Sequence, residues 1–147
     1  LRRLLKVDVI EQIICVNDCS KDRSLAIVNQ LKKEDSRIKI ISNKVNNGKG
    51  FSITSAKKYI NTSHVAIHDA DLEYYTEDLI LMWEKVENFE ESLILGSRFI
   101  GSRTRKNVYK RTHFANNLVS LFFSLVNFYK VSDVAPCYKL FPHRFCQ

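Results

Sequence analysis

Short apolar runs that alternate with longer stretches of helical periodicity constrain this chain more than any other feature. Strand-like apolar runs cover residues 13–17, 38–42, 64–69 and 93–99. Between them, apolar residues recur every three or four positions over residues 24–34, 51–60 and 77–86. Repeated strand–helix units of this kind predict an α/β fold with a mostly parallel sheet and helices on both faces.

The length of the chain fits a single domain. It has 147 residues, of which 45% are hydrophobic, and this is enough apolar material for one packed core. The chain begins at Leu1 rather than methionine and stops at Gln147, just after a strand-like run. We therefore expect residues 1–147 to form one domain that is truncated at its N-terminus and at its C-terminus.

An excess of basic residues narrows the class of partner. The chain has 23 Lys and Arg residues against 16 Asp and Glu residues, which gives a formal net charge of +7. This charge favours phosphates, acidic lipid or nucleic acid without choosing among them. The four cysteines form no C-x-x-C pair in the sequence, which favours reduced thiols.

Charged side chains occur at the ends of three of the strand-like runs. Asp18 directly follows the first run, Asp69 and Asp71 close the third, and Arg98 lies near the end of the fourth. Because ligands of open α/β sheets bind at the carboxyl ends of the strands, we expect these residues to share one rim. Each alone fits an ordinary polar loop residue, so their coincidence at one edge carries the prediction of a ligand site.

Asp69, Asp71 and Glu73 are spaced two residues apart. On extended backbone their side chains leave the chain on the same face. Clustered carboxylates near a partly buried strand end repel one another unless a proton or a cation offsets their charge. A solvated acidic turn is the alternative for an isolated D-x-D, but the strand-end position favours a hard divalent cation, Mg²⁺ or Mn²⁺.

The residues after the first strand divide between two predicted roles. Ser20 and Asp22 are placed to cap the helix over residues 24–34, which leaves Asp18 free to accept hydrogen bonds from a base or a ribose. Arg98 can donate a bidentate pair of hydrogen bonds to a diphosphate, and a surface salt bridge is its alternative.

A basic run precedes an apolar, uncharged stretch late in the chain. Residues 103–111 include five Lys or Arg, and residues 114–129 form a helical pattern with one apolar face. This stretch is shorter than the roughly 20 apolar residues of a membrane-spanning helix. A buried core helix and a helix lying in the membrane surface both fit, and the basic run favours membrane contact through residues 98–129.

Five sequence motifs occur in the order seen in family 2 glycosyltransferases, at residues 16–22, 47–50, 69–74, 96–99 and 137–141. Over nearly its whole length the chain resembles the dolichol-phosphate mannosyltransferase and polyprenyl-phosphate glycosyltransferase group. The resemblance implies the GT-A type of nucleotide-binding α/β fold and a single glycosyltransferase catalytic domain. The family's first strand, with its Pro-x-Tyr/Phe-Asn-Glu motif, has no counterpart here, so we expect an incomplete donor pocket.

The resemblance also implies roles for single residues. The expected nucleotide-sugar contacts are Val16, which would line the base pocket, Asp18, Asp69, Ala70, Asp71, Arg98 at the diphosphate, and Lys139 near the phosphates. The expected metal ligands are Asp71 and Glu73, together with Asp69 from the reasoning above. Asp71 and Arg98 are the residues expected to carry catalysis.

The implied reaction moves a sugar from a GDP- or UDP-sugar to a polyprenyl or dolichyl phosphate by a metal-assisted inverting displacement. Such an acceptor is already ionised near neutral pH. A saccharide hydroxyl acceptor would need a general base, and Asp133 is the nearest candidate by its position along the chain.

Two classes of protein other than glycosyltransferases also fit part of the sequence. A receiver-like signalling domain has an acidic pair after its first strand, where Asn17-Asp18 offers one acid. A basic nucleic-acid-binding module predicts no cluster like Asp69, Asp71 and Glu73, so no nucleic-acid partner is expected. The expected location is the cytoplasmic side of a membrane, the plasma membrane of a prokaryote or the endoplasmic reticulum of a eukaryote.

Overall fold

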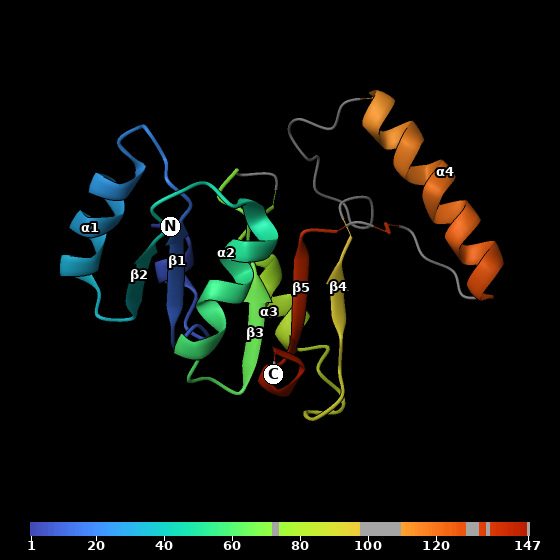
Figure 1. Ribbon diagram of the computed structural model, residues 1–147. Helices are drawn as coiled ribbons and strands as arrows, with labels where there is room; N and C mark the ends of the chain where they lie inside the picture. Colours follow the sequence, from blue (N-terminus) through green and yellow to red (C-terminus); the bar gives the residue numbers. More distant parts are fainter. Residues whose placement is uncertain (72–73, 98–109, 129–132, 135, 147) are drawn as a thin grey trace. The chain divides into compact units, whose positions relative to one another are not determined.

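The chain divides into two compact units in a computed structural model that describes residues 1–71, 74–97, 110–128, 133–134 and 136–146, the side chains of 110–114 excepted (Figure 1). Unit 1 comprises Leu1–Val65 and Pro142–Gln147, and unit 2 comprises Ala66–Phe141. The prediction of one catalytic domain stays a prediction.

Unit 1 is built on a pair of parallel strands, β1 (Ile13–Asn17) and β2 (Ile38–Ser42). Their register runs from Ile13 opposite Ile38 to Asn17 opposite Ser42. Helix α1 (Ser24–Glu34) connects the two strands and contacts both. The predicted bounds of these three elements are confirmed, because each has a clear apolar period and a polar loop on either side.

Unit 1 continues into α2 (Gly48–Ala56) and the short 3₁₀ helix η2 (Lys57–Tyr59). The predicted helix over residues 51–60 thus begins three residues early, at Gly48, and its last turn is a 3₁₀ helix. Two further 3₁₀ helices, η1 (Leu4–Lys6) and η3 (His143–Cys146), also belong to this unit.

Of the two residues predicted to cap α1, Asp22 and not Ser20 accepts a hydrogen bond from the first turn of the helix. Oδ1 of Asp22 accepts a hydrogen bond of 2.9 Å from the backbone N–H of Ser24. The N-cap position itself is Arg23, whose side chain makes no capping hydrogen bond. The backbone N–H of Ser20 instead donates to Oδ1 of Asn17, at 3.2 Å.

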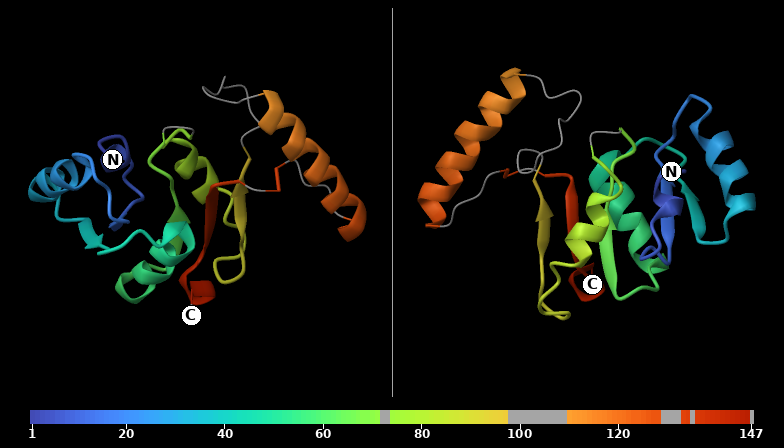
Figure 2. Two further views of the ribbon diagram at one scale, coloured as in Figure 1. Left: turned by 45° about the horizontal axis from the view of Figure 1, so that its top comes forward. Right: turned by 180° about the vertical axis from the view of Figure 1, so that it is seen from behind.

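Unit 2 holds most of a three-stranded sheet with the order β3-β5-β4. Its elements in chain order are β3 (His64–Ile67), α3 (Asp78–Trp83), β4 (Ile94–Gly96), α4 (Lys110–Asn127) and β5 (Tyr138–Pro142), of which β3 and β5 cross the unit boundary. Strand β5 is antiparallel to β4, with Gly96 opposite Tyr138, and the two strands lie side by side in both views of Figure 2. Strand β4, which was expected to belong to a mostly parallel sheet, is therefore antiparallel to its neighbour β5.

The core of unit 2 gathers around Tyr138, whose side chain is fully buried. Its ring stacks on that of Tyr74, with centroids 4.4 Å apart and planes inclined by 28°. Leu79 and Met82 of α3 are also buried, and α3 contacts β4. The predicted helix over residues 77–86 is real but shorter.

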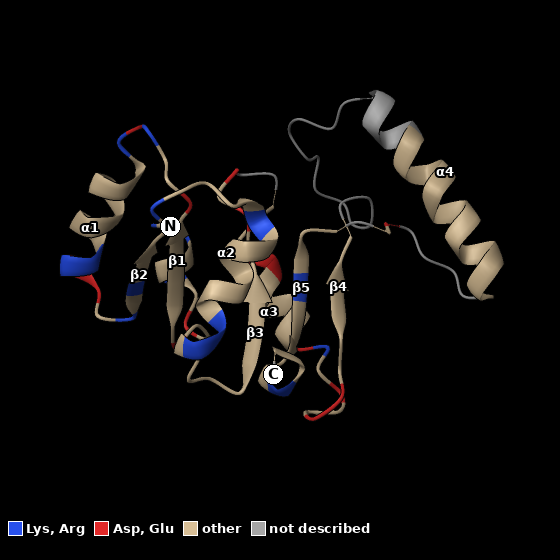
Figure 3. Cartoon of the chain, in the orientation of Figure 1, with Lys and Arg blue, Asp and Glu red and all other residues tan. Residues whose placement is uncertain are grey.

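Helix α4 includes most of the apolar stretch predicted over residues 114–129. Its small polar residues Asn116 and Ser120 are buried, and Oγ of Ser120 accepts a hydrogen bond of 3.1 Å from the backbone N–H of Val134. Its apolar side chains are largely exposed, and beyond its start the helix carries no charged residue (Figure 3). Among the described residues, no helix is both long enough and apolar enough to span a bilayer.

Candidate functional site

Asp18 follows β1 in unit 1 and accepts hydrogen bonds from the segment that leads into α2. Its Oδ1 accepts from the side-chain amide of Asn43 at 2.8 Å. Its Oδ2 accepts from the backbone N–H of Asn47 at 3.1 Å and from that of Gly48 at 2.7 Å. Gly48, with φ of +80°, has a backbone conformation that favours glycine.

This arrangement corrects the prediction that Asp18 is free. The helix that Asp18 contacts is not α1, which directly follows it in the sequence, but the start of the later helix α2. The hydrogen bond from Asn43, together with those from the amides of Asn47 and Gly48, lowers the pKa of the Asp18 carboxyl. The carboxylate therefore stays ionised and ties the end of β1 to the start of α2, while its contact with a nucleoside stays a prediction.

In unit 2, Asp69 and Asp71 follow β3. The side chain of Asp69 is half-buried and that of Asp71 is exposed. The thiol of Cys137, directly before β5, donates a hydrogen bond to Oδ2 of Asp69. Ala70 lies between the two acids in an exposed turn.

The segment after the two acids is held to the start of β5. The Tyr74 hydroxyl accepts a hydrogen bond of 2.8 Å from the backbone N–H of Cys137. The Tyr138 hydroxyl donates one of 3.1 Å to the carbonyl of Tyr75. The ring of His68 lies 5.2 Å from that of Tyr138, and burial lowers the pKa of its imidazole.

These contacts were not predicted from the sequence. Two of the sequence motifs, at residues 69–74 and 137–141, include Tyr74, Cys137 and Tyr138. Nothing in the spacing of these residues shows that β5 pairs with β3. The signal that could have found them is the strand-like run before Gln147, whose alternating buried and half-exposed residues form β5.

The remaining predicted residues divide between the two units. Val16 lies half-buried on β1 in unit 1, opposite Ile41. In unit 2, Lys139 lies on β5, on the strand face opposite to that of Tyr138, and Asp133 is 2% exposed. Glu73 and Arg98 lie outside the described residues.

The donors at this strand end fit a hard divalent cation. Asp69 and Asp71 offer carboxylate oxygens, and Mg²⁺ is commonly held by one or two protein carboxylates together with substrate phosphates. No group of three His, Cys, Asp or Glu side chains suited to a metal occurs among the described residues, a set from which Glu73 is missing. A complete all-protein cage is not what this chemistry requires.

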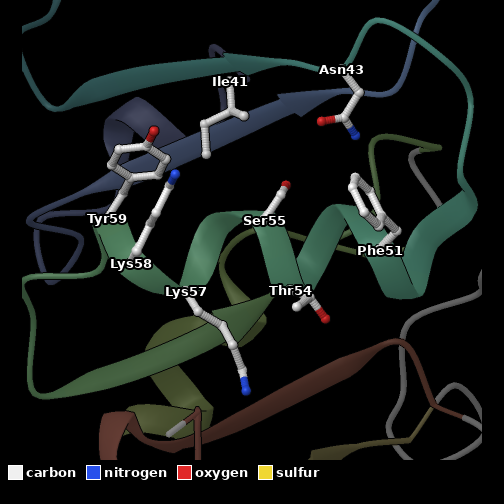
Figure 4. A pocket seen from close by; sticks show the side chains of 8 residues that line it. All are labelled: Ile41, Asn43, Phe51, Thr54, Ser55, Lys57, Lys58 and Tyr59. Atoms are coloured by element: carbon white, nitrogen blue, oxygen red, sulfur yellow. The ribbon is translucent and has the colours of Figure 1, made fainter.

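A pocket of about 420 Å³ lies in unit 1, along β2, α2 and η2. Its lining residues are Ile41, Asn43, Phe51, Thr54, Ser55, Lys57, Lys58 and Tyr59 (Figure 4). The Lys58 ammonium lies 5.0 Å from the centroid of the Tyr59 ring, and the Lys39 ammonium lies 4.1 Å from it. Asn43 lines this pocket and also donates a hydrogen bond to Asp18. This pocket was not predicted from the sequence.

Comparison with known proteins settles the class. The chain belongs to glycosyl transferase family 2, whose sequence profile matches residues 3–146. The family has the GT-A fold, so the α/β architecture of this chain is of the GT-A type. Membership of this family places the chain outside the receiver and nucleic-acid-binding classes.

Three curated proteins are similar to parts of the chain. It is 31% identical over 106 residues to poly(ribitol-phosphate) beta-glucosyltransferase of Bacillus spizizenii, a match of 69% of this chain and 17% of that protein. It is 23% identical over 140 residues to dolichyl-phosphate beta-glucosyltransferase ALG5A of Trichomonas vaginalis, which is 92% of this chain and 43% of that protein.

The third is the uncharacterized glycosyltransferase YkcC of Bacillus subtilis. The chain is 36% identical to it over 74 residues, a match of 50% of this chain and 23% of that protein. The chain thus spans less than half the length of each of these relatives.

Proposed function

We propose that this chain is the catalytic part of a glycosyltransferase that moves a sugar from a GDP- or UDP-sugar to a polyprenyl or dolichyl phosphate. The observation that carries the proposal is the family match over residues 3–146, with Asp69 and Asp71 in the segment that follows β3. Two of the similar proteins are beta-glucosyltransferases by name, which favours a glucosyl donor.

The reaction is a displacement at the anomeric carbon with inversion. An oxygen of the acceptor phosphate forms the new bond to that carbon, and the bond from the carbon to the donor's diphosphate breaks. The nucleoside diphosphate leaves with the electron pair of that bond. An ionised phosphate acceptor needs no general base.

In this proposal the residues of the chain hold and orient the donor. Asp69, Asp71 and Glu73 would hold Mg²⁺ or Mn²⁺, which when bound would neutralise charge at the departing diphosphate. Arg98 donates hydrogen bonds to that diphosphate, with Lys139 near it. In unit 1, Asp18 and Val16 contact the nucleoside.

A hydroxyl acceptor is the second candidate, favoured by the likeness to the poly(ribitol-phosphate) beta-glucosyltransferase. Such an acceptor must lose a proton, and Asp133 is the proposed base. Transfer of radiolabelled glucose to dolichyl phosphate and to a polyol or saccharide acceptor, assayed side by side, separates the two candidates.

We also propose that the protein works at the cytoplasmic side of a membrane, which α4 contacts from the surface. Phe122, Leu125 and Val126 are each more than half exposed, and a membrane surface would cover them. The basic residues between 103 and 111 would attract anionic headgroups. An anionic membrane surface would therefore contact both the apolar residues of α4 and the basic segment that precedes it in the sequence.

The donor and the metal are tested together by isothermal titration calorimetry of the full-length protein. UDP-glucose and GDP-mannose are titrated with Mn²⁺ and with EDTA, into wild type, Asp71→Asn and Glu87→Gln, an exposed acid that serves as the charge-matched control. The expected result is Mn²⁺-dependent binding of one sugar nucleotide that Asp71→Asn removes and Glu87→Gln preserves. Binding that ignores both Mn²⁺ and Asp71, or no binding at all, overturns the proposal.

A further inference from the structure

The contact between Cys137 and Asp69 joins two residues 68 positions apart in the sequence. Asp69 directly follows His68 at the end of β3, and Cys137 directly precedes β5. A thiol is a weak donor, but a hydrogen bond to an ionised carboxylate is stronger than one to a neutral acceptor. The contact therefore has a preferred direction, from the thiol to the carboxylate.

The backbone of Cys137 is fixed by its neighbours. Its N–H donates to the hydroxyl of Tyr74, a residue that is 3% exposed and stacks on the fully buried Tyr138. Tyr138 in turn donates to the carbonyl of Tyr75. These contacts hold the backbone of Cys137 in place, and its thiol reaches Asp69 from this fixed position.

We propose that Cys137 is a positioning residue for the metal site, and that its thiol orients the Asp69 carboxylate toward the cation. This inference rests on the proposed function. The thiol bonds to Oδ2 and thereby restricts the rotation of the Asp69 carboxylate. Hydrogen bonds to ligating side chains are commonly worth about 10- to 100-fold in metal affinity.

The test measures Mn²⁺ binding directly, by the loss of the free-ion signal in electron paramagnetic resonance as protein is added. Cys137→Ala removes the donor, and Cys137→Ser restores one of similar size. The expected result is a Kd for Mn²⁺ raised about 10-fold or more in Cys137→Ala and close to wild type in Cys137→Ser. Cys15→Ala, a half-buried thiol on β1, is the matched control and should leave the Kd unchanged.

Thermal unfolding followed by circular dichroism separates positioning from folding. A Cys137→Ala variant that melts earlier but binds Mn²⁺ like wild type overturns the inference, because Cys137 would then be merely structural. If Cys137→Ala does not fold, Cys137→Val, which fills the space without a donor, replaces it.

The two proposals fail in different ways. Uptake of Mn²⁺ that Asp71→Asn abolishes but loss of the Cys137 thiol leaves unchanged removes this inference alone. If wild type takes up no Mn²⁺, the metal site and this inference both fall.

Discussion

The backbone N–H of Gly48 donates a hydrogen bond of 2.7 Å to Oδ2 of Asp18, a residue 30 positions earlier. The first N–H groups of a helix have no partner within it, and the helix dipole favours a negative charge at this end. Asp18 supplies both a partner and the charge. The carboxylate that follows β1 therefore organises the start of α2.

Replacing Asp18 should loosen this connection. Asp18→Ala removes the acceptor for three hydrogen-bond donors, those of Asn43, Asn47 and Gly48, so we expect a midpoint of thermal unfolding several degrees below that of wild type. Asp18→Asn keeps one acceptor oxygen, so its unfolding midpoint should lie between those of Asp18→Ala and wild type. Glu11→Gln, an exposed acid in the same unit, is the control and should melt like wild type. Equal midpoints for Asp18→Ala and Glu11→Gln would contradict the assigned role.

The same hydrogen bonds predict a pH dependence. Because they lower the pKa of Asp18 in the folded state, the unfolded chain binds a proton there at a higher pH, near its ordinary pKa of about 3.9. The contribution of Asp18 to stability is thus present above about pH 4 and is lost as the pH falls through the lower folded pKa. Urea unfolding of wild type and Asp18→Asn, from about pH 6 to about pH 3, should show their difference in free energy shrinking toward acid pH. If the difference in free energy of unfolding between wild type and Asp18→Asn stays constant or grows toward acid pH, Asp18 does not stabilise the fold through these hydrogen bonds.

Local patterns were sufficient to predict much of unit 1. The apolar periods of β1, α1 and β2 are set by neighbours along the chain, and their predicted bounds match those of the structure. Asp18 was misjudged because its partners lie 25 to 30 residues away, beyond β2. No periodicity in the sequence encodes that distance.

Unit 2 shows the same limit more strongly. Asp69 and Asp71 were predicted to be metal ligands from their spacing and their place after a strand, and this stays a prediction. The pairing of β5 with β3, which brings Cys137 to Asp69, depends on contacts across more than 60 residues. Side-chain packing around Tyr138 selects that pairing, and packing is not visible in residue order.

The close approach of β4 to β5 makes Gly96 hard to replace. A Cβ at this position would lie 2.6 Å from Cβ of Tyr138 and 3.2 Å from Sδ of Met82. Gly96→Ala should therefore lower the free energy of unfolding by about 1–3 kcal/mol, as measured by urea denaturation.

Gly50 provides the matched control for Gly96. It lies within α2, and a Cβ there would meet no heavy atom within 4 Å. Gly50→Ala should be neutral or raise the free energy of unfolding by up to about 1 kcal/mol, since alanine favours the helix. If Gly96→Ala lowers the free energy of unfolding no more than Gly50→Ala does, Gly96 is not tightly packed against Tyr138.

Helix α4 should bind anionic membranes through its exposed apolar residues. Phe122 is 69% exposed and Leu125 is 66% exposed, and burial of such side chains is worth about 1.5–3 kcal/mol each. The double variant Phe122→Ser/Leu125→Ser should therefore lower partitioning into phosphatidylserine-containing vesicles by about 10-fold or more in a co-sedimentation assay.

The control for this membrane prediction is Val45→Ser, which changes a side chain that is 64% exposed in unit 1. It should leave vesicle binding unchanged, because Val45 belongs neither to α4 nor to the basic segment 103–111 in the sequence. Higher salt should weaken wild-type binding by screening those basic residues, while neutral vesicles should bind less protein. Vesicle binding that the Phe122→Ser/Leu125→Ser variant retains in full would instead assign the exposed face of α4 to a protein partner, because lipid would no longer explain its composition.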